Sequence, residues 1–330
     1  MSRGKHPMEF GVIGLGKMGS NFCLHAAQKG MRVVGYSQKI RNEQQLRSGK
    51  IEIADDLKSL VGSLSLRPRK IFLYVPAGPV VDLVIKSLVP LLSSGDVIVD
   101  AGNSHFRDSA VRHDQVREIG IGFVDCGSSG GPSGALTGGC FMVGGDEKDV
   151  KIIEPILKAL AVEDGYIHAG PPGAGHFVKL VHNGIEFGML QAIGEGVSLL
   201  KASAYEIDLP SLFHSWANGS VIRGWLVELM EKGLRENPDL NRIPSYIEDT
   251  GEVNWLLEEA VRSEISIPVM MQSVMELFSS RDDKQVSRRS VSILRHEFGE
   301  HPFGKDAEIA MERKVGHVGV SSKKSKGKAA

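Results

Sequence analysis

The chain has 330 residues, more than one hydrophobic core usually serves, so we expect two domains. Its formal net charge of −1 gives no overall field that would attract nucleic acid or an acidic membrane, and we predict neither partner. No apolar run reaches about 18 residues, and the N-terminus lacks the apolar stretch of a signal peptide. The cysteines, Cys23, Cys126 and Cys140, show no metal-ligand spacing. We therefore predict a cytoplasmic globular protein with reduced thiols and no metal site.

The first half of the chain alternates short β-type runs with helical patterns. Apolar, β-branched strands are predicted in EFGVIGLG, MRVVGYS, KIFLYVPA, DVIVDAGN and GFVDCGSS, between residues 9 and 129. GCFMVGGD and EDGYIHAG are expected to be later strands of the same sheet. Strands of this kind with intervening helices predict an α/β domain of Rossmann type, in which a parallel sheet is covered by helices on both faces.

The clearest break in this pattern is AGPPGAG at residues 169–175, because two prolines and three glycines continue neither a strand nor a helix easily. Beyond it the pattern is helical, with a loop at 237–245 and helices predicted at 176–202, 208–216, 219–236, 252–263 and 267–279. We place an α/β domain at 1–172 and an all-α domain at 173–310. The small, basic residues at 311–330 are expected to be a disordered tail.

A glycine-rich turn follows the first predicted strand. Gly14, Gly16 and Gly19 have the G-x-G-x-x-G spacing, and a helical pattern comes directly after them. Glycines in this context allow a tight turn and a close approach to a pyrophosphate, which then faces the N-terminus of the helix. The sequence therefore predicts a dinucleotide-binding domain with cofactor contacts from Gly14, Leu15, Gly16, Lys17, Met18 and Gly19.

The end of the next predicted strand bears on the choice of cofactor. An NAD site usually offers an acidic residue there to the ribose hydroxyls, whereas this chain has Ser37, Gln38 and Lys39, with Arg41 nearby. No acid is present to repel a 2′-phosphate, and two cations could bind one. We therefore favour NADP over NAD, with Ser37, Gln38 and Lys39 as contacts; the alternative is that these are solvated charges.

Three further strand ends carry chemically useful residues, and strand ends of an open sheet form its ligand crevice. Val75, Pro76 and Ala77 are expected to line the nicotinamide pocket, and Asn103 offers a donor and an acceptor to cofactor or substrate. SSGGPSG, at 128–134, offers a hydroxyl and backbone amides at Ser129, Gly130 and Gly131. Each alone is more typical of a turn, but three at one sheet edge indicate a site.

A polar stripe interrupts the apolar run GHFVKLVHNGIEFGM, residues 175–189. Lys179, His182, Asn183 and Glu186 are spaced 0, 3, 4 and 7, so they lie on one helical face. Buried charges are costly without partners, and apolar residues cover much of the rest of the helix. The pattern therefore favours the wall of a polar cavity over a solvated face. Gly184 and Gly188 indicate that another segment packs closely there.

Such a cavity would contain a base and an acid. A lysine in partly dry surroundings loses its proton more easily, and a glutamate there retains its proton more easily. This pair suits a substrate that loses a proton at one atom and gains one at another.

The sequence closely resembles the short form of the decarboxylating 6-phosphogluconate dehydrogenases, within the β-hydroxyacid dehydrogenases, from about residue 9 to about residue 303. The resemblance rests on DAGNS, SSGG, GAGHFVKLVHNGIEF and LRHEFGEHPF, the last of which contains Arg295 and His301. It implies oxidative decarboxylation of 6-phosphogluconate to ribulose 5-phosphate and CO2, with reduction of NAD(P). It also implies that Lys179 is the general base and Glu186 the general acid. The implied substrate ligands are Asn103, Ser129, Gly130, Gly131, His182, Asn183, Arg295 and His301.

Several positions depart from the family pattern at the expected phosphate site. Phe187 stands where a tyrosine is usual, Asn254 and Leu256 replace a basic residue and a threonine, and Leu277 replaces an arginine. Arg281, four residues further on, could substitute for that arginine. An unphosphorylated sugar acid or another β-hydroxy acid is therefore an alternative substrate. A non-catalytic dinucleotide-binding protein is a second alternative, although it would not need the acid–base pair.

The resemblance also implies subunit contacts. Family members bury long apolar helices between subunits, so we expect a homodimer or homotetramer in which the helical domain serves dimerisation and Arg295 and His301 complete the partner's site.

Overall fold

The structure, a computed structural model, describes residues 8–40, 42–307 and 309–311. Arg41 and most of the predicted tail, residues 312–330, lie outside the described residues. The chain divides into two compact units, one comprising Met1–Ile243 and Glu248–Glu276, the other Pro244–Ile247 and Leu277–Ala330. In the described part of the chain, no helix combines the length and apolar character needed to cross a bilayer.

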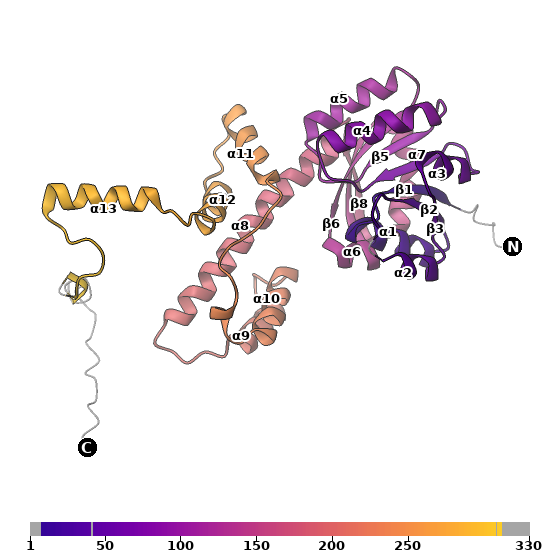
Figure 1. The fold of residues 1–330 in the computed structure, drawn as a ribbon. Helices are drawn as coiled ribbons and strands as arrows, with labels where there is room; N and C mark the ends of the chain where they lie inside the picture. Colours follow the sequence, from indigo (N-terminus) through magenta and orange to yellow (C-terminus); the bar gives the residue numbers. More distant parts are fainter. Residues whose placement is uncertain (1–7, 41, 308, 312–330) are drawn as a thin grey trace. The chain divides into compact units, whose positions relative to one another are not determined.

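The first unit contains an eight-stranded sheet in the order β3-β2-β1-β4-β5-β6-β7-β8. Figure 1 shows this sheet with helices around it. Its strands are β1 (Glu9–Ile13), β2 (Arg32–Tyr36), β3 (Glu52–Ile53), β4 (Lys70–Leu73), β5 (Val97–Asp100), β6 (Gly122–Ser129), β7 (Gly139–Gly145) and β8 (Ala161–Gly170). The predicted Rossmann-type fold is confirmed, and strand order reverses beside β1, which places a ligand crevice there. The sheet is parallel except for the antiparallel pair β6–β7, which was not foreseen. The two-residue β3 was also missed.

Helices cover both faces of the sheet because side chains alternate along each strand. Phe10 and Val12 of β1 pack with α1 (Lys17–Gln28), α2 (Glu43–Ser48) and α7 (Glu147–Leu160). Ile13 of the same strand packs on the other face with α3 (Leu57–Ser63), α4 (Pro79–Leu88) and α5 (Phe106–Arg117). The short η1 (Val89–Leu91) and α6 (Gly131–Thr137) complete this half. The two apolar layers fix the strands whose carboxyl ends form the site.

Helices follow the sheet, as predicted. They are α8 (Ala174–Ala202), α9 (Leu209–Ala217), α10 (Trp225–Glu236), η2 (Leu240–Arg242), α11 (Glu252–Arg262), α12 (Pro268–Ser280) and α13 (Val286–Gly299). The helix predicted at 219–236 begins only at Trp225, because Gly219 has φ +153° and the residues after it form a turn. The predicted loop at 237–245 contains η2. The break at 169–175 falls between β8 and α8, and the predicted domain boundaries stay predictions.

Candidate active site

The glycine-rich turn lies where β1, β4 and α1 meet. Gly14 has φ +99°, and a Cβ there would lie 2.3 Å from the carbonyl oxygen of Tyr74. A Cβ on Gly19 would lie 2.0 Å from the carbonyl oxygen of Gly14, so strand and helix need glycine at both positions. Gly16 faces open space and is the N-cap of α1, with no side-chain cap on the helix amides. This open, uncapped helix end fits the pyrophosphate of a dinucleotide.

The other predicted cofactor residues differ from the glycines and from one another in exposure and contacts. Leu15 has a fully buried side chain, so only its backbone is available to a ligand. Lys17 and Gln38 are exposed, and Met18 lines the pocket described below. The hydroxyl of Ser37 donates to the carbonyl oxygen of Lys39 at 2.9 Å, which closes the turn after β2.

The strand ends meet at one sheet edge, but their residues do not all reach the same space. Asn103 and the predicted turn of Ser129, Gly130 and Gly131 line one large pocket. Val75, Pro76 and Ala77 are not among its lining residues, so their predicted contact with nicotinamide remains a prediction.

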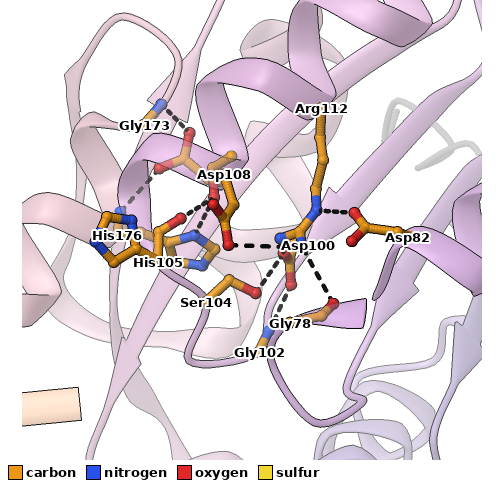
Figure 2. Close-up of polar contacts among 12 residues, drawn as sticks. Gly78, Asp82, Asp100, Gly102, Ser104, His105, Asp108, Arg112, Gly173 and His176 are labelled. Carbon is orange, nitrogen blue, oxygen red and sulfur yellow. Dashed lines mark hydrogen bonds and ion pairs between the residues drawn. The ribbon is translucent and has the colours of Figure 1, made fainter. Parts of the chain in front are cut away.

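The N-terminus of α8 is held by the sheet. The buried carboxylate of Asp125 on β6 accepts hydrogen bonds from the backbone amides of Gly173, at 2.7 Å, and His176, at 2.8 Å. Gly173 and His176 are labelled in Figure 2. A Cβ on Gly127 of the same strand would lie 2.5 Å from Cβ of Lys179. Strand β6 therefore sets both the start of the helix and the position of Lys179 along it.

His182 connects the polar stripe to the strand end. Its Nε2 lies 2.9 Å from the hydroxyl of Ser129, and its Nδ1 lies 3.4 Å from Nζ of Lys179. The tautomer protonated at Nε2 donates to Ser129 and lets Nδ1 accept from the lysine, whereas the tautomer protonated at Nδ1 accepts from Ser129 and donates to Oδ1 of Asn183. The same Nδ1 is 3.2 Å from Oδ1 of Asn183 and 3.7 Å from a carboxylate oxygen of Glu186. The four residues of the stripe thus form one contact network.

The environment of Lys179 makes its ammonium a stronger acid. Burial lowers the pKa of Lys179 from its usual value of 10.5, while the carboxylates of Glu186 and Glu252 raise this pKa and oppose the effect. Because desolvation is the largest cause, the neutral amine forms more easily than on an exposed lysine.

The stripe lines a pocket of about 1310 Å³. Its polar lining comes from Asn103, Ser128, Ser129, Lys179, His182, Asn183, Glu186, Glu248, Asp249, Thr250 and Glu252. Most of the rest is lined by apolar side chains of α8 and α10, including Phe187, Trp225 and Leu229. Among these described lining residues Lys179 is the one lysine or arginine, against four carboxylates. Such a pocket can hold a polar substrate beside a base and an acid.

Glu252 is a pocket residue that the sequence did not reveal. It lies in the first turn of α11, where its carboxylate accepts from Nδ2 of Asn183 at 3.5 Å and from the hydroxyl of Thr250. Ser128, beside the predicted Ser129, was missed in the same way. In the sequence, the only signal for Glu252 was that it follows Gly251 at the start of a helix. The packing of α11 on α8 shows that its carboxylate faces Asn183.

The positions that depart from the family pattern either carry apolar side chains or lie outside the pocket lining. Phe187 lines the pocket without a hydroxyl. Leu256 is buried, and its Cδ2 lies 2.1 Å from where a Cβ on Gly184 would stand, so the close packing predicted at that glycine is present. At Gly188 the contact is an ordinary one. Asn254 is exposed and does not line the pocket.

Within the second unit, Leu277 is buried, and Arg281 donates to the carbonyl oxygen of Ile247 at 2.6 Å. Arg281 therefore holds the segment 244–247. Arg295 and His301 lie together, with Nη2 and Nε2 3.4 Å apart.

A Rossmann-type sheet with a glycine turn at a helix start, followed by helices that carry a lysine–glutamate pair, defines a nicotinamide-dinucleotide-dependent oxidoreductase. Comparison with known proteins gives the family. Residues 9–170 match the NAD binding domain of 6-phosphogluconate dehydrogenase, and residues 175–315 match the C-terminal domain of that enzyme. The chain belongs to the 6-phosphogluconate dehydrogenase family and is an NAD(P)-dependent oxidoreductase of the decarboxylating type.

Individual relatives agree with this assignment. The chain is 41% identical to YqeC of Bacillus subtilis, over 89% of this chain and 98% of that protein. It is 40% identical to the NAD-dependent, decarboxylating 6-phosphogluconate dehydrogenase of Haloferax volcanii, again over 89% and 98%. The solved 6-phosphogluconate dehydrogenase of Plasmodium falciparum superposes with a TM-score of 0.78 at 27% identity, over 91% of this chain and 66% of that one.

Proposed function

We propose that the chain oxidatively decarboxylates 6-phosphogluconate to ribulose 5-phosphate and CO2 with NAD or NADP. The observation that carries this proposal is the convergence of Lys179, His182, Asn183 and Glu186 on the pocket that Asn103 and Ser129 also line. A base and an acid seven residues apart on one helix suit a reaction with separate proton removal and proton return.

The cofactor would be held by the open helix end at Gly16 and by the strand ends after β1, β2 and β4. When bound, it accepts a hydride from the substrate. The residues Ser37, Gln38 and Lys39 would face its adenosine ribose, and we favour NADP because none of them is acidic. Lys39→Ala should then reduce the ratio of kcat/KM for NADP to that for NAD, by up to about fivefold for one exposed charge pair. An unchanged ratio would remove the support for NADP.

Lys179 is proposed to take the proton of the substrate's 3-hydroxyl. Its lowered pKa makes the neutral amine available, and the contact with His182 holds the nitrogen in place. The resulting ammonium can then donate a hydrogen bond to the new ketone, which stabilises the negative charge that develops there as CO2 leaves.

Glu186 is proposed to return a proton to C1 after CO2 has left. Its side chain is 40% exposed, so it can exchange protons with solvent between turnovers. Asn103, His182, Asn183 and the amides of Ser129, Gly130 and Gly131 would bind the carboxylate and hydroxyls of the sugar acid.

A second candidate is the same reaction on an unphosphorylated sugar acid. It is favoured by Phe187 in the lining and by Leu256, which packs against α8 and offers no polar group. Carboxylates also outnumber cations in the described lining, and a phosphate dianion is bound best by cations.

A substrate panel separates the two candidates. Gluconate and 6-phosphogluconate, each with NAD and NADP, are followed for reduced cofactor and for CO2. Preference for the phosphorylated acid supports the first candidate, and preference for gluconate supports the second. Reduction without CO2 would contradict decarboxylation, and no reduction with any acid would contradict both candidates.

We also propose that Arg295 and His301 complete the site of a second subunit in a homodimer or homotetramer. Helix α13 has no buried residue and exposes Val291, Leu294 and Phe298, an apolar surface that association would cover. Mixing the inactive variants Lys179→Met and Arg295→Met should restore activity, because some mixed sites would have both residues. No recovery after subunit exchange would contradict this arrangement.

A further inference from the structure

A buried arginine connects the loops that follow two neighbouring strands, β4 and β5, at the ligand edge of the sheet. Arg112 lies in α5 and is 3% exposed. Its Nε donates to Asp82 at 2.7 Å, and its Nη2 donates to the carbonyl oxygen of Gly78 at 3.1 Å (Figure 2). Its Nη1 lies 3.6 Å from a carboxylate oxygen of Asp100. One guanidinium thus contacts the start of α4 and the end of β5.

Asp100 shapes the loop that carries Asn103. It is fully buried, and its two carboxylate oxygens accept from the amide of Gly102, at 3.1 Å, and the hydroxyl of Ser104, at 2.7 Å (Figure 2). Asn103 stands between these two anchored residues and lines the pocket. The position of its side chain therefore depends on the carboxylate of Asp100.

The other loop is in direct contact with this one. A Cβ on Gly102 would lie only 2.9 Å from the carbonyl oxygen of Val75, so the segment 75–78 packs against the segment 100–104. Arg112 holds the far end of the first segment through Gly78 and supports the second through Asp100. Loss of the arginine would leave a fully buried carboxylate without its nearest cation, and such a group gains a proton or moves.

We propose that Arg112 is a positioning residue of the dinucleotide site, which fixes the two loops without touching the cofactor. The inference uses the NAD(P) binding of the family and is independent of the substrate. Arg112→Met should weaken cofactor binding about tenfold or more, because displacement of a binding group by about 1 Å is costly.

The chain provides a matched control at the opposite end of the same strand. Asp96 precedes β5, is 1% exposed and pairs with Arg69 at 3.0 Å, while also accepting from the amides of Arg69 and Ser93. This ion pair is nearly as buried, with the Arg69 side chain 11% exposed, but it lies at the amino end of the strand, away from the ligand edge. Arg69→Met therefore removes a comparable interaction from the same domain without disturbing either loop.

The experiment compares both variants of the full chain with the unaltered protein. Dissociation constants for NADH and NADPH are measured by fluorescence titration, thermal midpoints by calorimetry and amide exchange by mass spectrometry without cofactor. Both variants should melt earlier. Only Arg112→Met should bind the cofactor weakly and exchange faster at 75–78 and 100–104.

Two results would overturn the proposal: unchanged cofactor affinity in folded Arg112→Met, or equal weakening in Arg69→Met. If Arg112→Met does not fold, the double variant Arg112→Met/Asp100→Asn provides the test, because it removes both charges of this buried pair. Weak cofactor binding by the folded double variant supports the positioning role, and normal binding contradicts it. Arg112→Lys keeps the positive charge but not the several N–H donors of the guanidinium. Its affinity for the cofactor should therefore lie between those of the unaltered protein and Arg112→Met.

Discussion

The two sides of the pocket differ in how their side chains are fixed. On the side of β6 and the N-terminal half of α8, Lys179, His182 and Ser129 form a continuous set of contacts anchored on the sheet. On the other side, Phe187 and side chains of α10 are apolar. The carboxylate of Glu252 there accepts hydrogen bonds from Asn183 and Thr250. In the proposed function, the first side transfers protons, and the second contacts the remainder of the substrate.

This contrast leads us to propose that the reaction and the recognition of the substrate are separable parts of the site. Removal of a group on the β6 side should lower kcat with every substrate. A change on the opposite side should alter the preference among substrates and leave kcat for the best one nearly unchanged.

The largest effect is expected at Lys179. Lys179→Met should lower kcat about 10²–10⁴-fold, because the variant lacks the positioned base, while cofactor affinity stays within about twofold. Stopped-flow measurement of cofactor reduction gives the chemical step directly. A near-normal rate would show that Lys179 is not the base, and Lys201→Met, at the far end of the same helix, serves as the control.

A methyl group at Gly127 should displace the base without removing it. Its Cβ would lie 2.5 Å from Cβ of Lys179 and 3.0 Å from the carbonyl oxygen of Gly175. We expect Gly127→Ala to destabilise the fold by about 1–3 kcal/mol and to lower kcat about tenfold or more. Chemical denaturation and steady-state kinetics measure the two effects.

Gly194→Ala is the matched control for this change, since a Cβ at Gly194 in α8 meets nothing within 4 Å. It should stabilise the protein by about 0.5–1 kcal/mol with unchanged kcat. Full activity in Gly127→Ala would disprove the proposed support of Lys179 by β6.

The recognition of the substrate's phosphate is tested by introducing a hydroxyl group at position 187. A hydrogen bond to a charged group contributes about 1.5–3 kcal/mol, so Phe187→Tyr should raise kcat/KM for 6-phosphogluconate relative to gluconate about tenfold or more. Phe177→Tyr makes the same chemical change ten residues earlier in the pocket lining and should leave the ratio unchanged. If the ratio of kcat/KM for 6-phosphogluconate to that for gluconate is the same in Phe187→Tyr as in Phe177→Tyr, the phosphate does not bind near residue 187.

The smallest effect is a shift in pH dependence. The carboxylate of Glu252 raises the pKa of Lys179, so its removal in Glu252→Gln lowers that pKa further. Because the neutral amine is the active form in the proposed mechanism, kcat/KM should rise with pH through this pKa. The rising limb should therefore move to lower pH in Glu252→Gln, whereas Glu248→Gln should leave it in place. A shift to higher pH would contradict the assignment of this limb to Lys179.

Much of the α/β half could be predicted because its signals are local. Short apolar strands separated by amphipathic helices, with glycines at fixed spacing, determine a sheet and a turn from the residues of each element alone. The antiparallel β7 could not be predicted, since a strand's periodicity is the same in either direction. The residues of the stripe share one helical face for the same local reason, whereas the burial of Leu256 against Gly184 depends on two helices about seventy positions apart.

The sequence by itself determined which side chains share a helix face and where a phosphate could meet a helix end, because period and spacing act within one element. Only the tertiary structure decided what those faces meet. It brought Ser129 to His182, Glu252 to Asn183 and Arg112 to Asp100, across 53, 69 and 12 positions. Such contacts arise when whole elements pack to bury apolar surface, and no single segment contains that information.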